Sequence, residues 1–310
     1  MSAAPCHRLR AGAHTLDLGG RPLLMGVVNA SPDSFSDAGR YTTLGQRLQL
    51  AAELLASGAD ILDIGGESAS TDRPAVAVER EIELVAPLVE RAAGELGALV
   101  SVDTYKPQVA RAAIAAGACI VNDVSGLRDP ELAGICAEAG AALVVMHTRA
   151  APKQRLQRPD LYGDVVAETI AFLRERVELA RAQGVPAERL IVDPGPDFAK
   201  TPAQTVELLA ALPRLHELGL PLLMAISRKD FIGALTARPP RERGAGTLAA
   251  LAHGVDCGAH IFRVHDVAAA SDFLAVRAAL RGEVAVAPEL ALGEELRRDR
   301  GERGPDRLAS

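Results

Sequence analysis

The chain has 310 residues, of which 48% are hydrophobic and 24% charged, and its formal net charge at pH 7 is −6. This composition is typical of a globular protein with a large core. With no basic excess, no Trp, 3 Tyr and 6 Phe, the chain lacks the features that nucleic-acid binding uses, so we expect no nucleic-acid partner.

The N-terminal segment and the cysteines indicate the compartment. The segment MSAAPCHRLRAGAH has no apolar stretch, and no run of 18 apolar residues follows it, so we expect no secretion signal and no membrane association. The four cysteines, Cys6, Cys119, Cys136 and Cys257, form no CxxC pair. We interpret them as reduced thiols of a cytoplasmic protein.

In chain order, the first predicted element is a short hairpin within residues 7–21. From Leu23 onward, short apolar runs rich in β-branched residues alternate with longer stretches of helical period. Several of these stretches end in Gly, and Pro107, Pro130 and Pro202 fall where helices should begin. Eight strands are predicted, at 23–29, 60–66, 98–104, 119–124, 142–148, 189–195, 221–227 and 260–266.

Eight strand–helix units predict a (β/α)₈ TIM barrel whose closed end is capped by the N-terminal hairpin. The alternative is a doubly wound open sheet. Against it, no GxGxxG follows the first strand, and every predicted strand ends in polar side chains, which only a barrel brings to one mouth. We predict a single barrel domain over residues 1–282 and a charged, flexible tail over residues 283–310.

The last strand carries the most informative pattern, HIFRVHDV at 260–267. Side chains alternate along a strand, so Arg263 and His265 should share one face. Together they suit an anion, with His265 expected to be chargeable near neutral pH. The alternative is that Arg263 pairs with Asp266 or with another neighbouring carboxylate.

Other strand ends offer donors and acceptors. Asn29 begins a long loop over residues 30–43, and its alternative role is that of a turn former. Ser227 and Lys229 are two residues apart, although Lys229 could be a solvated strand end. The acidic and amide ends form a second sector that suits a donor-rich heterocycle: Asp63, Asp103, Asn122 and Asp193. A magnesium ion shared with substrate phosphates is easier to support than an all-protein metal cage.

Eight ordered motifs give the chain a family resemblance. They are MGVVNASPDSFSDAG, DILDIGGES, SVDTYKPQVARAAIAAGACIVNDVSG, VVMHT, IVDPGPDFAKT, SRKDFIG, GTLAA and RVHDV. In this order, from Leu23 to about Leu280, they resemble the dihydropteroate synthase family. The resemblance implies a (β/α)₈ barrel that condenses 6-hydroxymethyl-7,8-dihydropterin diphosphate with p-aminobenzoate and releases diphosphate in folate biosynthesis.

The resemblance also implies roles for individual residues. The pterin ring would be held by Asp103, Asn122 and Asp193, with Asp63 beside them and Lys229 on the ring's carbonyl side. The diphosphate would meet Arg263 and His265, with Mg²⁺ on Asn29. Ser227 and Phe198 would lie near p-aminobenzoate. The residues expected to act in catalysis are Arg263, His265 and Lys229. The resemblance further suggests a homodimer.

Three motifs depart from the family pattern on the p-aminobenzoate side. GGESTRPG becomes GGESASTDRP, with Ala69 and Ser70 in place of Thr and Arg; DPGIGFGK becomes DPGPDFAK, with Pro196 and Asp197; and AISRK lacks the Gly-Thr pair before SRK. One hypothesis is a working synthase with a reshaped pocket and altered sulfonamide sensitivity. The other is a divergent pterin-binding paralogue without synthase activity. A methyltetrahydrofolate:corrinoid methyltransferase ranks last, because it has no reason to keep the SRK and RVHD motifs.

Overall fold

The structure, a computed structural model, describes residues 5–31, 41–68, 74–293 and 296–297. The chain divides into two compact units, Met1–Asp272 and Phe273–Ser310. The first unit contains the whole sheet and the candidate site. The domain boundary that we place at residue 282 remains a prediction.

Eight parallel strands form the sheet, in the order β8-β7-β6-β5-β4-β3-β10-β9. A further parallel bridge joins Val192 of β8 to Leu222 beside β9 and brings the two edges together. The predicted barrel and all eight predicted strands are therefore confirmed, and the open-sheet alternative is wrong. The strands are β3 (Leu23–Asn29), β4 (Ile61–Gly65), β5 (Val100–Asp103), β6 (Ile120–Asp123), β7 (Ala142–Met146), β8 (Leu190–Asp193), β9 (Leu223–Met224) and β10 (Ile261–Val264).

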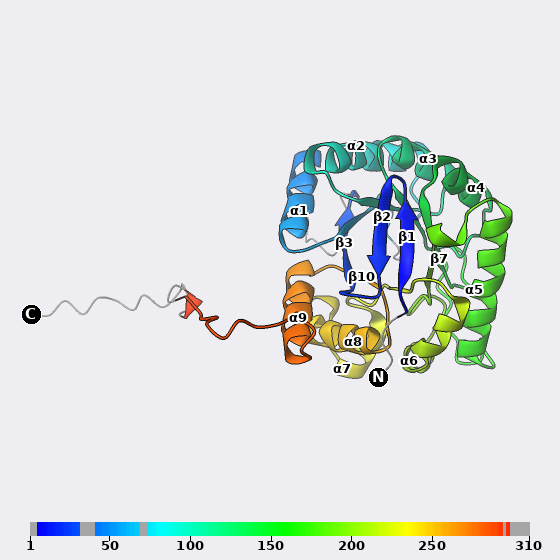
Figure 1. Cartoon of the computed structure of the whole chain (residues 1–310). Coiled ribbons are helices and arrows are strands. Elements are labelled where there is room, and N and C mark those ends of the chain that lie inside the picture. The colour runs from blue at the N-terminus through cyan, green and yellow to red at the C-terminus, as the bar shows by residue number, and fades with distance from the viewer. Residues whose placement is uncertain (1–4, 32–40, 69–73, 294–295, 298–310) are drawn as a thin grey trace, which may run out of the picture. The chain divides into compact units, whose positions relative to one another are not determined.

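Within the first unit, helices α1 to α8 surround the strands (Figure 1). Pro107 and Pro202 occupy first-turn positions, as predicted, while Gly97 and Gly140 end α2 and α4 in the left-handed region. The α-helices are α1 (Leu44–Ala56), α2 (Val78–Leu96), α3 (Pro107–Ala115), α4 (Glu131–Ala139), α5 (Val165–Ala182), α6 (Pro202–Ala210), α7 (Asp230–Thr236), α8 (Gly244–Asp256) and α9 (Val267–Leu280). Short 3₁₀ helices span Ala187–Arg189, Leu212–Leu218 and Pro240–Glu242.

An antiparallel hairpin, β1 (His7–Ala11) and β2 (His14–Leu18), lies across one end of the barrel (Figure 1). Its side chains Leu9, Ala11 and Leu18 are buried in one cluster with the early residues of several barrel strands, including Ile120 and Ala142. The predicted cap on the closed end is therefore confirmed. Because this end is filled by apolar side chains, the opposite end is left to carry polar chemistry.

The structure also bears on the cysteines and on membrane-spanning helices. The four cysteines are free thiols, with Cys136 buried and Cys6 exposed. Among the described residues, every helix is too short or too polar to cross a membrane.

Candidate active site

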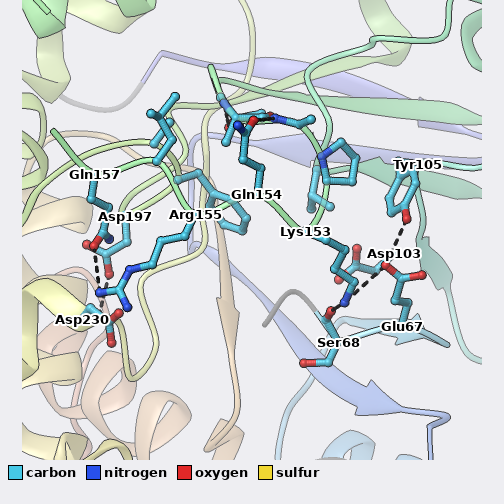
Figure 2. Close-up of a pocket in the computed structure, with 18 of the residues that line it drawn as sticks. Glu67, Ser68, Asp103, Tyr105, Lys153, Gln154, Arg155, Gln157, Asp197 and Asp230 are labelled. Carbon is cyan, nitrogen blue, oxygen red and sulfur yellow. Dashed lines mark hydrogen bonds and ion pairs between the residues drawn. The ribbon is translucent and has the colours of Figure 1, made fainter. Parts of the chain in front are cut away.

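A cavity of about 500 Å³ opens at the carboxyl ends of the strands. One wall is the segment after β7, residues 148–157, and another is the start of the loop after β4, at Glu67 and Ser68. Figure 2 shows Lys153 reaching toward Ser68 and Glu67 on one side, with Asp197 and Asp230 on the other. Asp103, Phe198 and Lys229 also line the cavity, so three predicted site residues face the same space.

Arg263 lies between two carboxylates. Its Nε donates to Oδ2 of Asp63 at 2.6 Å, and one terminal nitrogen donates to Oδ2 of Asp103 at 2.7 Å. Asn122 Nδ2 also donates to Oδ2 of Asp63, at 3.1 Å. The sequence analysis placed Arg263 in an anion-binding sector apart from the acids. The structure joins the two sectors, because the carboxylates of Asp63 and Asp103 neutralise the guanidinium. The alternative of an Arg–Asp pair is thus observed, with Asp63 and Asp103 as the partners.

Two buried acceptors near Arg263 have no hydrogen-bond partner among the described residues. They are Oδ1 of Asp63 and Oδ1 of Asn122, on side chains that are 0% and 2% exposed. An unsatisfied buried acceptor is costly. The two oxygens therefore suit a ligand that brings N–H donors, as the predicted donor-rich heterocycle would.

Burial raises the pKa of two carboxyls in this group. The pKa of Asp103 rises to about 7, because desolvation and the neighbouring Asp63 outweigh the attraction of Arg263. The pKa of Asp193 rises to about 6 through desolvation, although Gly195 N donates to its Oδ1 at 2.7 Å. Both carboxyls can therefore change protonation state near neutral pH when a ligand arrives.

His265 differs electrostatically from the prediction. Its Nδ1 lies 3.0 Å from Oγ of Ser227, and its backbone N–H donates to the same oxygen. Burial and the nearby cations, Arg263 first among them, lower its pKa to about 3. The expectation that His265 is chargeable near neutral pH is therefore wrong: burial beside these cations makes it a neutral hydrogen-bonding group.

Lys229 and Phe198 form part of the cavity wall. The Lys229 ammonium lies 4.2 Å from the centroid of the Phe198 ring, a cation–π distance. Burial lowers the pKa of Lys229, while Asp197 and Asp193 act in the opposite direction. Lys229 is thus a half-buried cation with acids on two sides, not the solvated strand end that the sequence left open.

Some predicted features lie outside the described residues. Most of the loop after Asn29 and positions 69–73, which include Ala69 and Ser70, are among them. Asn29 itself ends β3 beside Gly65 of β4, at the same end of the barrel as the other residues.

The sequence analysis missed a buried charge cluster beside the cavity. Lys106 Nζ contacts Oε2 of Glu67 at 2.7 Å, Oε2 of Glu81 at 2.5 Å and the carbonyl oxygen of Val76 at 2.6 Å. The Val76 N–H donates to Glu67 as well. The cluster fixes Val76, after the divergent second loop, against the end of β4. Two members of the cluster could have been noticed in the sequence, because Glu67 lies in the motif segment GGES and Lys106 ends the segment DTYK.

A second missed residue is Lys200, which is fully buried. Its Nζ donates to the carbonyl oxygens of Gly195 at 2.8 Å and Phe198 at 3.0 Å. Desolvation lowers its pKa to about 7. By holding these two carbonyls, Lys200 shapes the loop that carries Phe198.

Comparison with known proteins identifies the family of this barrel. Residues 25–265 match the family described as "Pterin binding enzyme". Dihydropteroate synthases of Synechocystis sp. and Bacillus subtilis are 41% and 42% identical, over 88% and 80% of this chain and 94% and 84% of theirs. A Xanthomonas albilineans dihydropteroate synthase structure with 4-aminobenzoic acid aligns with a TM-score of 0.82 and 44% identity, covering 89% of this chain and 99% of that one. Another, in complex with 7,8-dihydropteroate, gives 0.79 and 44%, covering 88% and 98%. As its ordered motifs predicted, the chain belongs to the pterin-binding enzyme family, among the dihydropteroate synthases.

Proposed function

We propose that this transferase condenses 6-hydroxymethyl-7,8-dihydropterin diphosphate with p-aminobenzoate, releases diphosphate, and does so with the residues described above. The observation that carries the residue assignment is the pair of unsatisfied acceptors on Asp63 and Asn122 beside the Arg263 guanidinium. A pterin supplies the missing donors, and its diphosphate supplies an anion for the cation.

The pterin ring binds at the floor of the site. Its 2-amino group and ring N–H groups donate to Asn122 and to the carboxylates of Asp103 and Asp193. The raised pKa values of these two carboxyls fit this role, because a donor-rich ligand stabilises the ionised form that burial disfavours. Lys229 donates to the carbonyl side of the ring from the opposite wall.

The reaction replaces one bond with another. The C–O bond between the pterin methylene and the diphosphate breaks, and its electron pair leaves with the diphosphate. The aniline nitrogen of p-aminobenzoate forms the new C–N bond and loses a proton to water or to a diphosphate oxygen. Arg263 stabilises the charge that develops on the leaving group, and neutral His265 donates a hydrogen bond to it. Ser227 and Phe198 line the side from which the amine approaches.

The site suits a magnesium ion that is held mainly by the substrate and only weakly by the protein. No group of three or more His, Cys, Asp or Glu in the described part of the chain could hold a metal ion. The ion would therefore be bound mainly by substrate phosphates and water, with the amide oxygen of Asn29 as a hard protein ligand. It would supply further neutralisation of the diphosphate charge.

The proposal also covers the cellular location and the oligomeric state. The free cysteines support a cytoplasmic location, since reduced thiols are typical of that compartment. A homodimer is proposed from the family resemblance alone.

The decisive experiment measures diphosphate release from the pterin diphosphate with and without p-aminobenzoate, together with formation of 7,8-dihydropteroate. A synthase releases diphosphate in proportion to dihydropteroate. Pterin binding without release in either condition would instead identify the divergent paralogue. Rescue of a folate-auxotrophic strain tests the same distinction in cells, and inhibition by a sulfonamide tests whether the altered second-substrate side still accepts such compounds.

A further inference from the structure

Asp197 is one of the residues at which this chain departs from the family pattern within the sixth-strand motif. It lies in the loop after β8, between Pro196 and Phe198, and it lines the cavity. Its φ is +65°, in the left-handed region, which aspartate and asparagine tolerate better than most side chains. This backbone geometry turns the carboxylate away from its own loop and toward the next one.

The carboxylate is held on both oxygens. Thr205 of α6 donates its hydroxyl to Oδ1 at 3.2 Å, and its Oγ1 in turn accepts the Asp197 N–H at 3.1 Å. Oδ2 accepts the backbone N–H groups of Asp230 at 2.5 Å and Phe231 at 3.3 Å. Asp197 therefore bridges α6 and the first turn of α7.

The first turn of α7 needs these acceptors. The residue that precedes the helix, Lys229, makes no side-chain cap, and the first N–H groups of any helix have no partner inside it. Asp197 supplies the acceptor from 33 residues earlier in the sequence. It acts as an N-cap from outside the helix, in a role that a local Asp, Ser or Thr usually performs.

The position of this bridge matters for the site. Asp197 precedes Phe198 and Asp230 follows Lys229, so the bridge ties together the two loops whose side chains meet at 4.2 Å. Figure 2 shows Asp197 and Asp230 next to each other at one edge of the cavity. Loss of the bridge would let the two loops move independently and would loosen the Lys229–Phe198 wall.

We infer that Asp197 is a positioning residue for the second substrate: by capping α7 from the preceding loop, it holds Lys229 against Phe198 and keeps that side of the cavity in its binding geometry. The inference rests on the proposed function for the identity of that substrate, p-aminobenzoate. The capping contact itself does not depend on it.

The test compares three variants. Asp197→Gly removes the carboxylate and accepts φ +65° without strain, so folding is spared. Asp197→Asn keeps the left-handed geometry and one acceptor oxygen. Asp164→Ala is the matched control, because Asp164 caps α5 through Val166 and Ala167 and is not among the residues that line the cavity.

Two readouts separate the capping contact from the substrate. In the unliganded proteins, hydrogen exchange at the Asp230 and Phe231 amides should accelerate about tenfold in Asp197→Gly, the factor that loss of a typical cap gives. In Asp197→Asn it should stay near wild type. In steady-state assays, Asp197→Gly should raise KM for p-aminobenzoate about fivefold to tenfold, and should raise KM for the pterin diphosphate less, because Lys229 is one of several groups proposed to hold the pterin ring. Asp197→Asn should restore both values, and Asp164→Ala should leave both as they are.

Unchanged amide exchange in Asp197→Gly would overturn the capping role. Faster exchange with an unchanged KM for p-aminobenzoate would overturn the positioning role, and so would an Asn variant as impaired as the Gly variant. If the wild-type chain makes no dihydropteroate, the proposed function fails by itself, and the exchange measurement still decides whether Asp197 caps α7.

Discussion

Removal of the Arg263 guanidinium tests the centre of the site. Arg263→Ala deletes two charge-assisted hydrogen bonds, to Asp63 at 2.6 Å and to Asp103 at 2.7 Å. At about 1.5–3 kcal/mol each they would sum to about 3–6 kcal/mol. The Arg263 side chain is 20% exposed, so we place the loss in free energy of unfolding near the lower end, about 3 kcal/mol.

The loss should depend on pH in a defined direction. The pKa of Asp103 is about 7 in the folded chain, above its value in the unfolded chain. Such a group adds stability below its unfolded pKa and loses it as pH rises through the folded pKa. Without Arg263 the folded pKa rises further, because the guanidinium lowers it now. At pH 6 Asp103 is protonated with or without Arg263, so its ion pair adds nothing to the stability lost in Arg263→Ala. At pH 8.5 Asp103 is ionised in the wild-type chain, and this part of the loss appears.

Urea unfolding at pH 6 and pH 8.5 measures this difference. The chain has no Trp, so far-UV circular dichroism is the suitable signal. Arg263→Lys is the matched control: it keeps the charge and one ion pair but cannot reach both carboxylates as a fork does, and its loss should be intermediate. Equal stability of Arg263→Ala and wild type, or a larger loss at pH 6 than at pH 8.5, would refute this account of the ion pairs. In turnover assays, Arg263→Ala should lower kcat at least about tenfold while pterin binding survives; unchanged turnover would refute the leaving-group role.

Three further predictions follow from the same contacts. Asp193→Asn keeps an acceptor for Gly195 and removes a carboxyl whose pKa is about 6. The unfolding free energy of the variant, relative to wild type, should therefore rise by about 2 kcal/mol between pH 4 and pH 8; a pH-independent difference would contradict this. Lys106→Met removes the ion pair of the buried Glu81, while Glu67 keeps Lys153 at 3.3 Å. The change should cost about 3 kcal/mol in thermal or urea unfolding, whereas a neutral result would mean that the Lys106 ion pairs contribute nothing. Chelation of divalent cations should slow diphosphate release at least about tenfold, and Asn29→Ala should raise the Mg²⁺ concentration needed for half-maximal rate; full activity in chelator would end the magnesium proposal.

The barrel could be predicted from the sequence because parallel strands buried on both faces are continuous apolar runs. β3 was predicted with its observed bounds, Leu23–Asn29, and most others within two residues. β9 is the exception, with two residues observed in a predicted seven. Pro221 and the turn into SRK leave few backbone hydrogen bonds between β9 and its neighbours, and an apolar run in the sequence does not reveal how many such bonds form.

Partners within the site could not be predicted from the sequence. Arg263 pairs with Asp63 and Asp103, which are 200 and 160 positions away. Alternation along a strand gives the face on which a side chain lies and says nothing of the neighbour across the barrel. The same limit applies to the pKa of His265, which depends on burial, on Arg263 of its own strand, and on Arg228 and Lys229 of the SRKDFIG motif. Lys200 was equally hidden, since a lysine in a polar motif is usually exposed.

The arrangement around Asp63 suggests how one cation can serve both the unliganded and the reacting enzyme. Oδ2 of Asp63 is already occupied by Arg263 and Asn122, whereas its Oδ1 has no partner among the described residues. In the proposed pterin complex, a donor-rich ring would therefore bind at Oδ1 and at the amide oxygen of Asn122 without first displacing the guanidinium. Arg263 has further N–H groups beyond the two that face the acids, and these remain available to the diphosphate. Because the carboxylates fix the guanidinium in place, the proposed role of Arg263 at the leaving group would need little reorganisation when charge develops there.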